Sequence, residues 1–151
     1  FGIPNNEIDF KQVEYALNLA HLTELTKSLK QGIHTKVGER GIQLSGGQRQ
    51  AIAIARAVGA DSSVVMLDEP TAALGVAQTR QVLEVVKRLR DTNHAVGYIS
   101  HNLHDIFEVS DRITVLRHGG NVATYRTSDI TPDEIVVAMT RGLDKETGDA
   151  A

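Results

Sequence analysis

The feature that most constrains the fold of this chain is a run of four apolar residues, Val64 to Leu67, which ends at Asp68-Glu69-Pro70. A short run without polar residues is typical of a buried strand in a parallel sheet, where ligands bind at the carboxyl ends of the strands. A second apolar segment, Ala95 to Ile99, ends in the same way at Ser100-His101. Apolar residues at helical spacing predict a helix between the two strands, from about Ala77 to Asp91. This order predicts an α/β fold with parallel core strands.

Apolar periodicity, turn residues and capping residues predict the rest of the organisation. The further elements are one or two helices from Phe10 to about Leu29, an irregular connector from Gly32 to Gln43, a helix from Gly46 to Val58, a short helix from Leu103 to Val109, a hairpin of residues 113–116 and 122–125 around Gly119-Gly120-Asn121, and a helix from Pro132 to about Arg141. Capping boxes are predicted for Asp9 with Gln12, Ser45 with Gln48, and Thr131 with Glu134. We expect a helical subdomain over residues 1–60, a core portion over residues 61–143, and a frayed tail over residues 144–151.

Composition excludes several classes of protein. The chain has no Cys, which excludes disulfides, thiolate metal sites and Cys nucleophiles. Its formal net charge is −3, which disfavours a nucleic-acid binder. No apolar run approaches the ~20 residues that cross a bilayer. No signal peptide opens the sequence, and the first residue is Phe1 instead of Met, so we expect a segment of a longer protein.

The most specific motif is Leu44-Ser45-Gly46-Gly47-Gln48, at the expected start of a helix. Glycines let a ligand approach the backbone closely, and unpaired amides at a helix N-terminus favour a phosphate. The Ser45 hydroxyl and the Gln48 amide add side-chain donors. The alternative is a plain capped helix with a flexible entry, which a bare Ser-Gly-Gly would favour. The longer string followed by Arg49-Gln50 is more specific and favours phosphate binding.

The acidic pair after the first strand is the second candidate site. Asp68 is suited to hold Mg²⁺, directly or through water, and Glu69 is suited to orient and deprotonate an attacking water. An isolated pair of this kind is more often a solvated strand cap. Here 23 residues separate Ser45 from Asp68, which leaves room for one helix and one strand and favours a functional pair.

The third candidate is His101, just after the second strand. Because parallel strands end at one edge of a sheet, we expect His101 to reach Glu69 and to contact a terminal phosphate or the water. A structural histidine is the alternative. His101 and His104 also form a one-turn pair with Asp105 nearby, but no further ligand has the spacing of a metal site.

Together these strings resemble the nucleotide-binding domain of ATP-binding cassette (ABC) transporters, over essentially the whole chain. The similar strings are Leu44 to Gln48 for the family signature, Val64 to Glu69 for the Walker B strand, Thr71 to Gly75 for the D-loop, and His101 for the switch histidine of the H-loop. The resemblance implies a P-loop NTPase-like α/β fold, present in part. It would comprise a helical subdomain followed by parallel core strands, a hairpin and a C-terminal helix.

The resemblance also implies roles, cofactors and a partner domain. Asp68 would serve Mg²⁺, Glu69 would polarise the attacking water, and His101 would contact the γ-phosphate of ATP. The segment from Ser45 to Gln48 would cover the γ-phosphate of an ATP held mainly by a second nucleotide-binding domain. Two such domains would close head to tail around two nucleotides.

Two departures from the family pattern change what is expected. A Walker A loop requires Gly-x-x-x-x-Gly-Lys-Ser/Thr, and none of the thirteen glycines is followed by Lys. We therefore expect the C-terminal portion of the domain, inactive as an ATPase by itself. Gly75 stands where the D-loop usually has Asp, so the coupling role of that Asp is not implied for this chain.

The favoured function is the ATP-hydrolysing subunit of a transporter at the cytoplasmic face of the membrane, partnered by transmembrane permease domains or subunits and by no nucleic acid. Residues 1–43 are exporter-like, because Thr35 to Gly41 resembles the exporter X-loop. Residues 44–143 are similar to importers of ribose, xylose and fructose, notably at Arg49-Gln50-Ala51 and Thr71 to Gln78. Sugar import is thus one option. The alternatives are a non-transport ABC ATPase, which the lack of a heptad run and the negative charge argue against, and a non-catalytic fragment.

Overall fold

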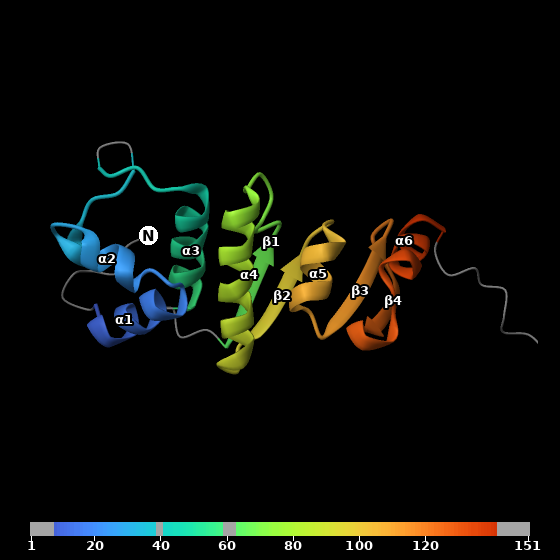
Figure 1. Ribbon diagram of the computed structural model, residues 1–151. Helices are drawn as coiled ribbons and strands as arrows, with labels where there is room; N and C mark the ends of the chain where they lie inside the picture. Colours follow the sequence, from blue (N-terminus) through green and yellow to red (C-terminus); the bar gives the residue numbers. More distant parts are fainter. Residues whose placement is uncertain (1–7, 39–40, 59–62, 142–151) are drawn as a thin grey trace, which may run out of the picture. The chain divides into compact units, whose positions relative to one another are not determined.

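The computed structural model describes residues 8–38, 41–58 and 63–141. Contacts divide the chain into two compact units, Phe1–Ile99 (unit 1) and Ser100–Ala151 (unit 2), which we describe separately (Figure 1). The expected subdomain boundary at residues 60/61 and the tail over residues 144–151 both fall outside the described residues and remain predictions. Among the described helices, none combines the length and the apolar character needed to span a membrane.

Unit 1 contains two parallel strands and a set of helices, which confirms the α/β class. Its elements are α1 (Phe10–Leu19), α2 (Thr23–Ser28), the 3-10 turn η2 (Gly32–His34), α3 (Gly46–Val58), β1 (Val64–Asp68), α4 (Val76–Asp91) and β2 (Ala95–Ile99). The apolar stretch after Phe10 forms two helices because the chain turns at His21, whose φ of 55° is left-handed. The bounds of α3 and β2 are the predicted ones, and α4 starts one residue earlier than predicted.

Small side chains pack α1 onto α3. Their shared core contains buried Ala16, Ala20, Leu22, Ala51 and Ala55. The predicted capping box at the start of α1 is wrong. The Asp9 carboxylate accepts a hydrogen bond from the Lys11 backbone N–H (2.9 Å), but among the described contacts the Gln12 side chain does not bond back to Asp9. Asp9 therefore caps the helix alone.

The strands β1 and β2 pair in parallel, with Val64 opposite Ala95 and Asp68 opposite Ile99. The five apolar residues predicted for the core face of α4 are all buried: Val82, Leu83, Val85, Val86 and Leu89. The prediction that β1 is buried throughout is wrong. Val64 and Met66 are 54% and 66% exposed, whereas Val65 and Leu67 are buried. Successive side chains point to opposite faces of a strand, and in the described residues only one face of β1 is covered.

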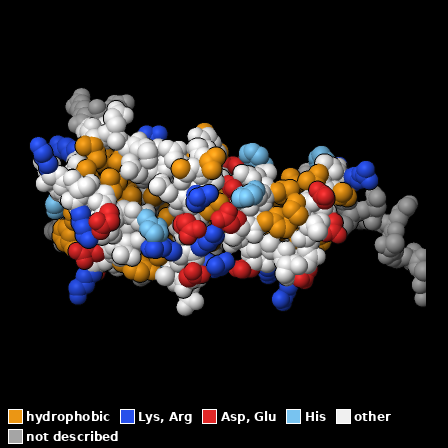
Figure 2. Space-filling model, viewed as in Figure 1, with side chains coloured by type: hydrophobic (Ala, Val, Ile, Leu, Met, Phe, Trp, Pro, Cys, Tyr) orange, Lys and Arg blue, Asp and Glu red, His pale blue; other side chains and the backbone are white. Residues whose placement is uncertain are grey.

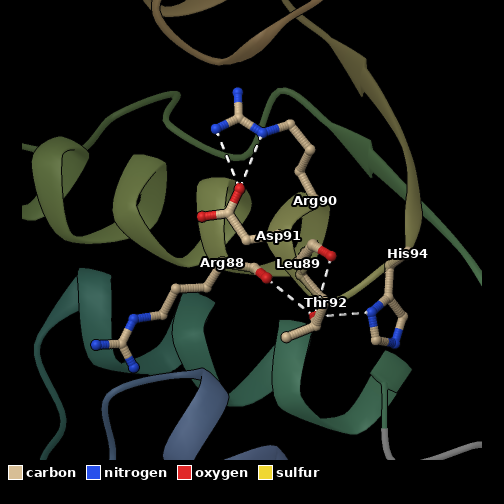
Figure 3. Close-up of polar contacts among 6 residues, drawn as sticks. All are labelled: Arg88, Leu89, Arg90, Asp91, Thr92 and His94. Atoms are coloured by element: carbon tan, nitrogen blue, oxygen red, sulfur yellow. Dashed lines mark hydrogen bonds and ion pairs between the residues drawn. The ribbon is translucent and has the colours of Figure 1, made fainter.

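The C-terminal end of α4 is closed by the Thr92 hydroxyl, which bonds the carbonyl oxygens of Arg88 (2.9 Å) and Leu89 (3.0 Å) and lies 3.1 Å from His94 Nδ1 (Figure 3). Asn93 follows with a left-handed φ of 62°, and the chain then enters β2. These bonds satisfy carbonyls that a helix end leaves unpaired. Acidic and basic side chains are mixed over this part of the surface (Figure 2). On α4 they include an ion pair between Lys87 and Glu84 at 3.0 Å.

Unit 2 is built on an antiparallel hairpin. Its elements are α5 (Leu103–Val109), β3 (Arg112–Arg117), β4 (Gly120–Arg126), the 3-10 turn η3 (Thr127–Asp129) and α6 (Pro132–Arg141). The prediction that Gly120 and Asn121 belong to the turn is wrong, because both are in β4. The turn is His118-Gly119, with left-handed φ angles of 49° and 76°, as a two-residue hairpin turn with matching twist requires.

The α6 helix packs on the hairpin through a small apolar core that contains Ile113, Val115, Ile135 and Ala138. The capping box predicted at its start is confirmed. The Glu134 carboxylate accepts hydrogen bonds from the Thr131 hydroxyl (2.7 Å) and the Thr131 backbone N–H (2.8 Å). These two bonds favour the charged form, so they lower the pKa of Glu134, the hydroxyl bond contributing most.

Candidate functional site

The start of α3 has the geometry that the Ser45–Gln48 spacing predicts. The Ser45 backbone N–H donates to Gln48 Oε1 (2.9 Å), and the Gln48 backbone N–H donates to Ser45 Oγ (3.2 Å). Arg49 Nη1 donates to the Leu44 carbonyl oxygen (2.8 Å), which holds the approach to the helix. Both side chains of the motif that could donate to a ligand therefore also serve as a helix cap.

The two glycines of the motif are the first two residues of α3. Amides at these positions have no intrahelical acceptor, and the helix dipole places partial positive charge there. Gly46 and Gly47 thus present the kind of donor that suits a phosphate. Gly47 is also buried, and an added Cβ would lie only 3.2 Å from Gln78 Cβ and 3.2 Å from Gln81 Oε1 on α4. A larger residue at position 47 would require the α4 side chains to shift, so close helix packing is a reason for this glycine that does not depend on a ligand.

The acidic pair lies at the carboxyl edge of the β1–β2 sheet. Asp68 is exposed and pairs in register with Ile99, and the half-buried Glu69 donates its backbone N–H to the Ile99 carbonyl oxygen (2.8 Å). Glu69 has a left-handed φ of 46°, a conformation that costs a non-glycine residue about 1–3 kcal/mol. The expectation that both strands end at one edge is confirmed, and backbone strain is placed at the residue predicted to act as a base.

A tight turn, which we call the Glu69 turn, begins at Glu69 and leads to Gly75. Its backbone is held by bonds from the Ala72 N–H to the Glu69 oxygen (3.1 Å) and from the Leu74 N–H to the Thr71 oxygen (3.2 Å). The buried Thr71 hydroxyl lies 3.3 Å from the Tyr98 hydroxyl of β2, which anchors the turn to the sheet. Ala73 has a left-handed φ of 60°. The turn thus leaves β1 in a fixed direction and leads to the start of α4.

The carboxylates of Asp68 and Glu69 suit a Mg²⁺ ion that is also bound by a phosphate. They suit a metal ion held by protein side chains alone less well. The described residues contain no group of three or more His, Cys, Asp or Glu side chains that could hold a metal ion. Mg²⁺ commonly takes one or two carboxylates and fills its other positions with water and substrate phosphates. The exposed Asp68 carboxylate, at a strand end beside Glu69, is compatible with that arrangement.

His101 lies in unit 2, two residues after β2 and just before α5. Its predicted reach toward Glu69 in unit 1 stays a prediction. The neighbouring His104 is exposed, with its Nδ1 3.7 Å from the Asp105 carboxylate and 3.9 Å from that of Glu108. These are local contacts at the start of α5, and they do not form a metal site within the described chain.

The residue that the sequence analysis missed is Gln78. Its Oε1 accepts a hydrogen bond from the Gly75 backbone N–H (3.2 Å), so it caps α4 from inside the helix, and its Cβ faces Gly47. A signal was present in the sequence, because Gln78 stands three residues after the N-cap position, which is the spacing of a capping box. Gly75 at that N-cap position concealed it, since glycine has no side chain to complete the box.

Comparisons with known proteins show to which sequences this chain is similar. Residues 6–72 match the family model described as ABC transporter. The ATP-dependent lipid A-core flippase of Cupriavidus pinatubonensis is 45% identical over 82% of this chain and 20% of its own length. Fructose import ATP-binding protein FrcA of Rhizobium meliloti is 43% identical over 80% of this chain and 45% of its own length. Ribose import ATP-binding protein RbsA of Lacticaseibacillus paracasei is 32% identical over 92% of this chain and 26% of its own length. The chain therefore spans less than half of each of these curated relatives.

Proposed function

Because the chain belongs to the ABC transporter family of ATP-binding proteins, we propose that it supplies the signature and hydrolysis motifs of a nucleotide-binding domain that powers solute transport. The observation that carries the proposal is the geometry at the carboxyl edge of the sheet. There Asp68 is the last residue of β1, Glu69 follows it where β2 also ends, and a backbone bond ties Glu69 to Ile99. The complete domain would bind Mg-ATP between two copies arranged head to tail.

The proposed chemistry is phosphoryl transfer to water. The Glu69 carboxylate would orient a water and accept its proton as the water oxygen attacks the γ-phosphorus. The bond between that phosphorus and the β–γ bridging oxygen would break, releasing ADP and inorganic phosphate. Mg²⁺, held through Asp68, would neutralise phosphate charge. His101 would donate a hydrogen bond to the γ-phosphate.

The signature segment would act on a nucleotide held mainly by the partner domain. Gly46 and Gly47 offer backbone amides at the start of α3, where the helix dipole favours a phosphate. Ser45 and Gln48 would add hydroxyl and amide contacts. Their mutual hydrogen bonds support this role by keeping the segment in one conformation before the nucleotide arrives, which lowers the entropic cost of binding.

The uncovered face of β1 supports the proposal that the complete domain has a further, phosphate-binding portion. Val64 and Met66 share this face with Asp68, and Ile99 of β2 is 51% exposed beside it. Parallel sheets are covered on both faces in stable proteins, so a further layer is expected here. We propose that this layer belongs to the complete nucleotide-binding domain and brings the Walker A loop, which the sequence lacks, to the side where Asp68 lies.

The complete protein would work at the cytoplasmic face of a membrane with permease domains or subunits. Sugar import is the transport function that we favour, because two of the relatives are named for fructose and ribose import. Arg49-Gln50-Ala51 and residues 71–78 add to this, since they resemble sugar importers. The lipid flippase relative supports the opposite direction. Uptake of labelled ribose, xylose and fructose by membrane vesicles bearing the full transporter would test this part. ATP-dependent movement of a lipid without sugar uptake would contradict it.

The ATPase proposal is tested by Glu69→Gln in the full-length protein that contains this chain. Loss of the base should lower phosphate release by roughly 10²–10⁴-fold and leave ATP binding unchanged. Glu14→Gln, an exposed change on α1, is the matched control and should leave both values at the wild-type level. Near-normal phosphate release from Glu69→Gln would show that Glu69 is not the base.

A second measurement uses the 151-residue chain alone. Without a Walker A loop it should bind Mg-ATP no more tightly than about millimolar, or ~4 kcal/mol, and should release no phosphate. Calorimetric titration and a phosphate assay measure these two quantities. Micromolar binding with steady turnover would show that the signature and Walker B segments bind and hydrolyse ATP without the missing loop.

A further inference from the structure

The signature glycines Gly46 and Gly47, at the start of α3, pack closely against Leu74 and Gln78, at and before the start of α4. The two helices lie side by side in unit 1 (Figure 1). A Cβ added to Gly46 would lie 2.9 Å from Leu74 Cδ2, and one added to Gly47 would lie 3.2 Å from Gln78 Cβ. Real Cβ contacts are essentially never under 3.0 Å and are seldom under 3.4 Å, so both glycines are at the limit of close approach. The signature therefore contacts the D-loop region of its own chain directly.

Gln78 joins the two sides of this contact. Its Oε1 accepts the Gly75 backbone N–H at 3.2 Å, while its Cβ and Cα face Gly47. Gly75 cannot cap α4 with a side chain of its own, and no other capping bond is seen at this helix start in the described residues. One half-buried side chain thus fixes the end of the turn and packs on the signature.

The turn that Gln78 fixes begins at the proposed base. Glu69 and Ala73 both have left-handed φ angles, of 46° and 60°. Such conformations persist only where surrounding contacts over-determine them. At one end the Thr71–Tyr98 contact ties the turn to the sheet, and at the other the Gly75–Gln78 bond ties it to α4. Glu69 itself is held by its backbone bonds with Ile99 (2.8 Å) and Ala72 (3.1 Å), so the two end contacts bear on the placement of the turn as a whole.

We propose that Gln78 is a positioning residue that holds the Glu69 turn against the signature glycines, so that the two motifs of one chain keep a single relative placement. Leu74, through its contact with Gly46, is the second part of this link. The inference rests on the proposed ATPase function. It assigns no contact with ATP to Gln78, which acts through Gly75 and Gly47.

The test compares Gln78 variants of the full-length protein. Gln78→Ala keeps the Cβ that faces Gly47 and removes the acceptor of the Gly75 N–H. It should lower kcat about tenfold, since small displacements of a catalytic group cost one to two orders of magnitude, and should leave the Kd for ATP unchanged. Gln78→Glu retains an acceptor and should restore kcat. Gln12→Ala, on the exposed side of α1, is the matched control.

A designed rescue separates positioning from general stability. Among the described residues, apart from the chain neighbours of Gly75, only Gln78 Oε1 lies within 4 Å of a Cβ added there (4.0 Å), so an Asp side chain fits and can cap α4 itself. Gly75→Asp should therefore restore kcat in the Gln78→Ala background. Leu74→Ala, which leaves the cap intact, should also lower kcat at constant ATP affinity, and it provides an independent test if Gln78→Ala does not fold.

The outcomes distinguish this inference from the proposed function. Wild-type kcat in either Gln78→Ala or Leu74→Ala would overturn the link, as would a loss that neither Gln78→Glu nor Gly75→Asp restores. If the wild-type full-length protein releases no phosphate from ATP, the proposed function and this inference both fall. If the wild-type protein releases phosphate and the variants have a normal kcat, the inference about Gln78 is wrong and the proposed function stands.

Discussion

Substitutions of Ser45 separate its role as a helix cap from its role toward a nucleotide. The Ser45 hydroxyl accepts the Gln48 backbone N–H at 3.2 Å. Ala at this position removes the cap and the hydroxyl together. Asp is as good an N-cap residue as Ser, but it adds a negative charge where we propose that a phosphate binds. Ser45→Ala should therefore lower the stability, whereas Ser45→Asp should keep the stability and lower the activity.

The size of each effect follows from the contacts. An N-cap Ser→Ala change costs about 0.5–2 kcal/mol. Here the lost bond is long and exposed, and the reciprocal bond from Ser45 N–H to Gln48 Oε1 (2.9 Å) remains, so Ser45→Ala should cost ~1 kcal/mol. For Ser45→Asp, like charges about 4 Å apart repel by ~4 kcal/mol at an effective dielectric constant of about 20. That is about 10³-fold in nucleotide-dependent activity.

Urea unfolding followed by far-UV circular dichroism measures the stability, since the sequence has no Trp to report by fluorescence. Phosphate release from the full-length protein measures the activity. Ser45→Asp should unfold at nearly the wild-type urea concentration and lose turnover. If Ser45→Asp hydrolyses ATP at the wild-type rate, the hydroxyl is a helix cap and nothing more. If Ser45→Ala unfolds at the wild-type midpoint, the cap contributes no measurable stability.

Three further predictions concern residues of unit 2. His101→Ala should slow phosphate release from the full-length protein without changing the Kd for ATP, and a lower melting temperature with normal turnover would instead assign His101 a structural role. Ile135→Ala should destabilise unit 2 by about 2–5 kcal/mol in urea unfolding, because Ile135 is 1% exposed, whereas Val137→Ala, at a 47% exposed site on the same helix, should cost about 0.5 kcal/mol or less. The lowered pKa of Glu134 adds stability that is present above the ordinary carboxyl pKa and lost as pH falls through the lowered value. Glu134→Gln should remove that part of the pH dependence measured by thermal unfolding, and an unchanged pH profile would show that the Thr131 bonds contribute nothing.

Local sequence was enough to predict most of the helices and two of their three predicted capping boxes, but not the box of Asp9 with Gln12 or the Gln78 cap of α4. The reciprocal Ser45–Gln48 bonds, the bounds of α3 and the Glu134 box on Thr131 all depend on groups within four residues of one another or on apolar periodicity. The candidate motifs were likewise visible as strings, because each combines unusual residue types over a few positions. Parallel pairing of β1 with β2 followed from the strand–helix–strand order.

The sequence by itself determined which residues are suited to the chemistry, since glycines before a helix and acids after an apolar strand have the required donors and acceptors. Only the tertiary structure decided that Val64 and Met66 lie on an uncovered face, that Gly47 is pressed against α4, and that Gln78 links the turn to the signature. These facts depend on which elements meet. An apolar strand does not show which of its faces will be covered, and a glycine does not show whether a ligand or a helix comes close to it. Such contacts join residues about thirty positions apart, beyond the reach of any local pattern, because they arise only when the chain packs.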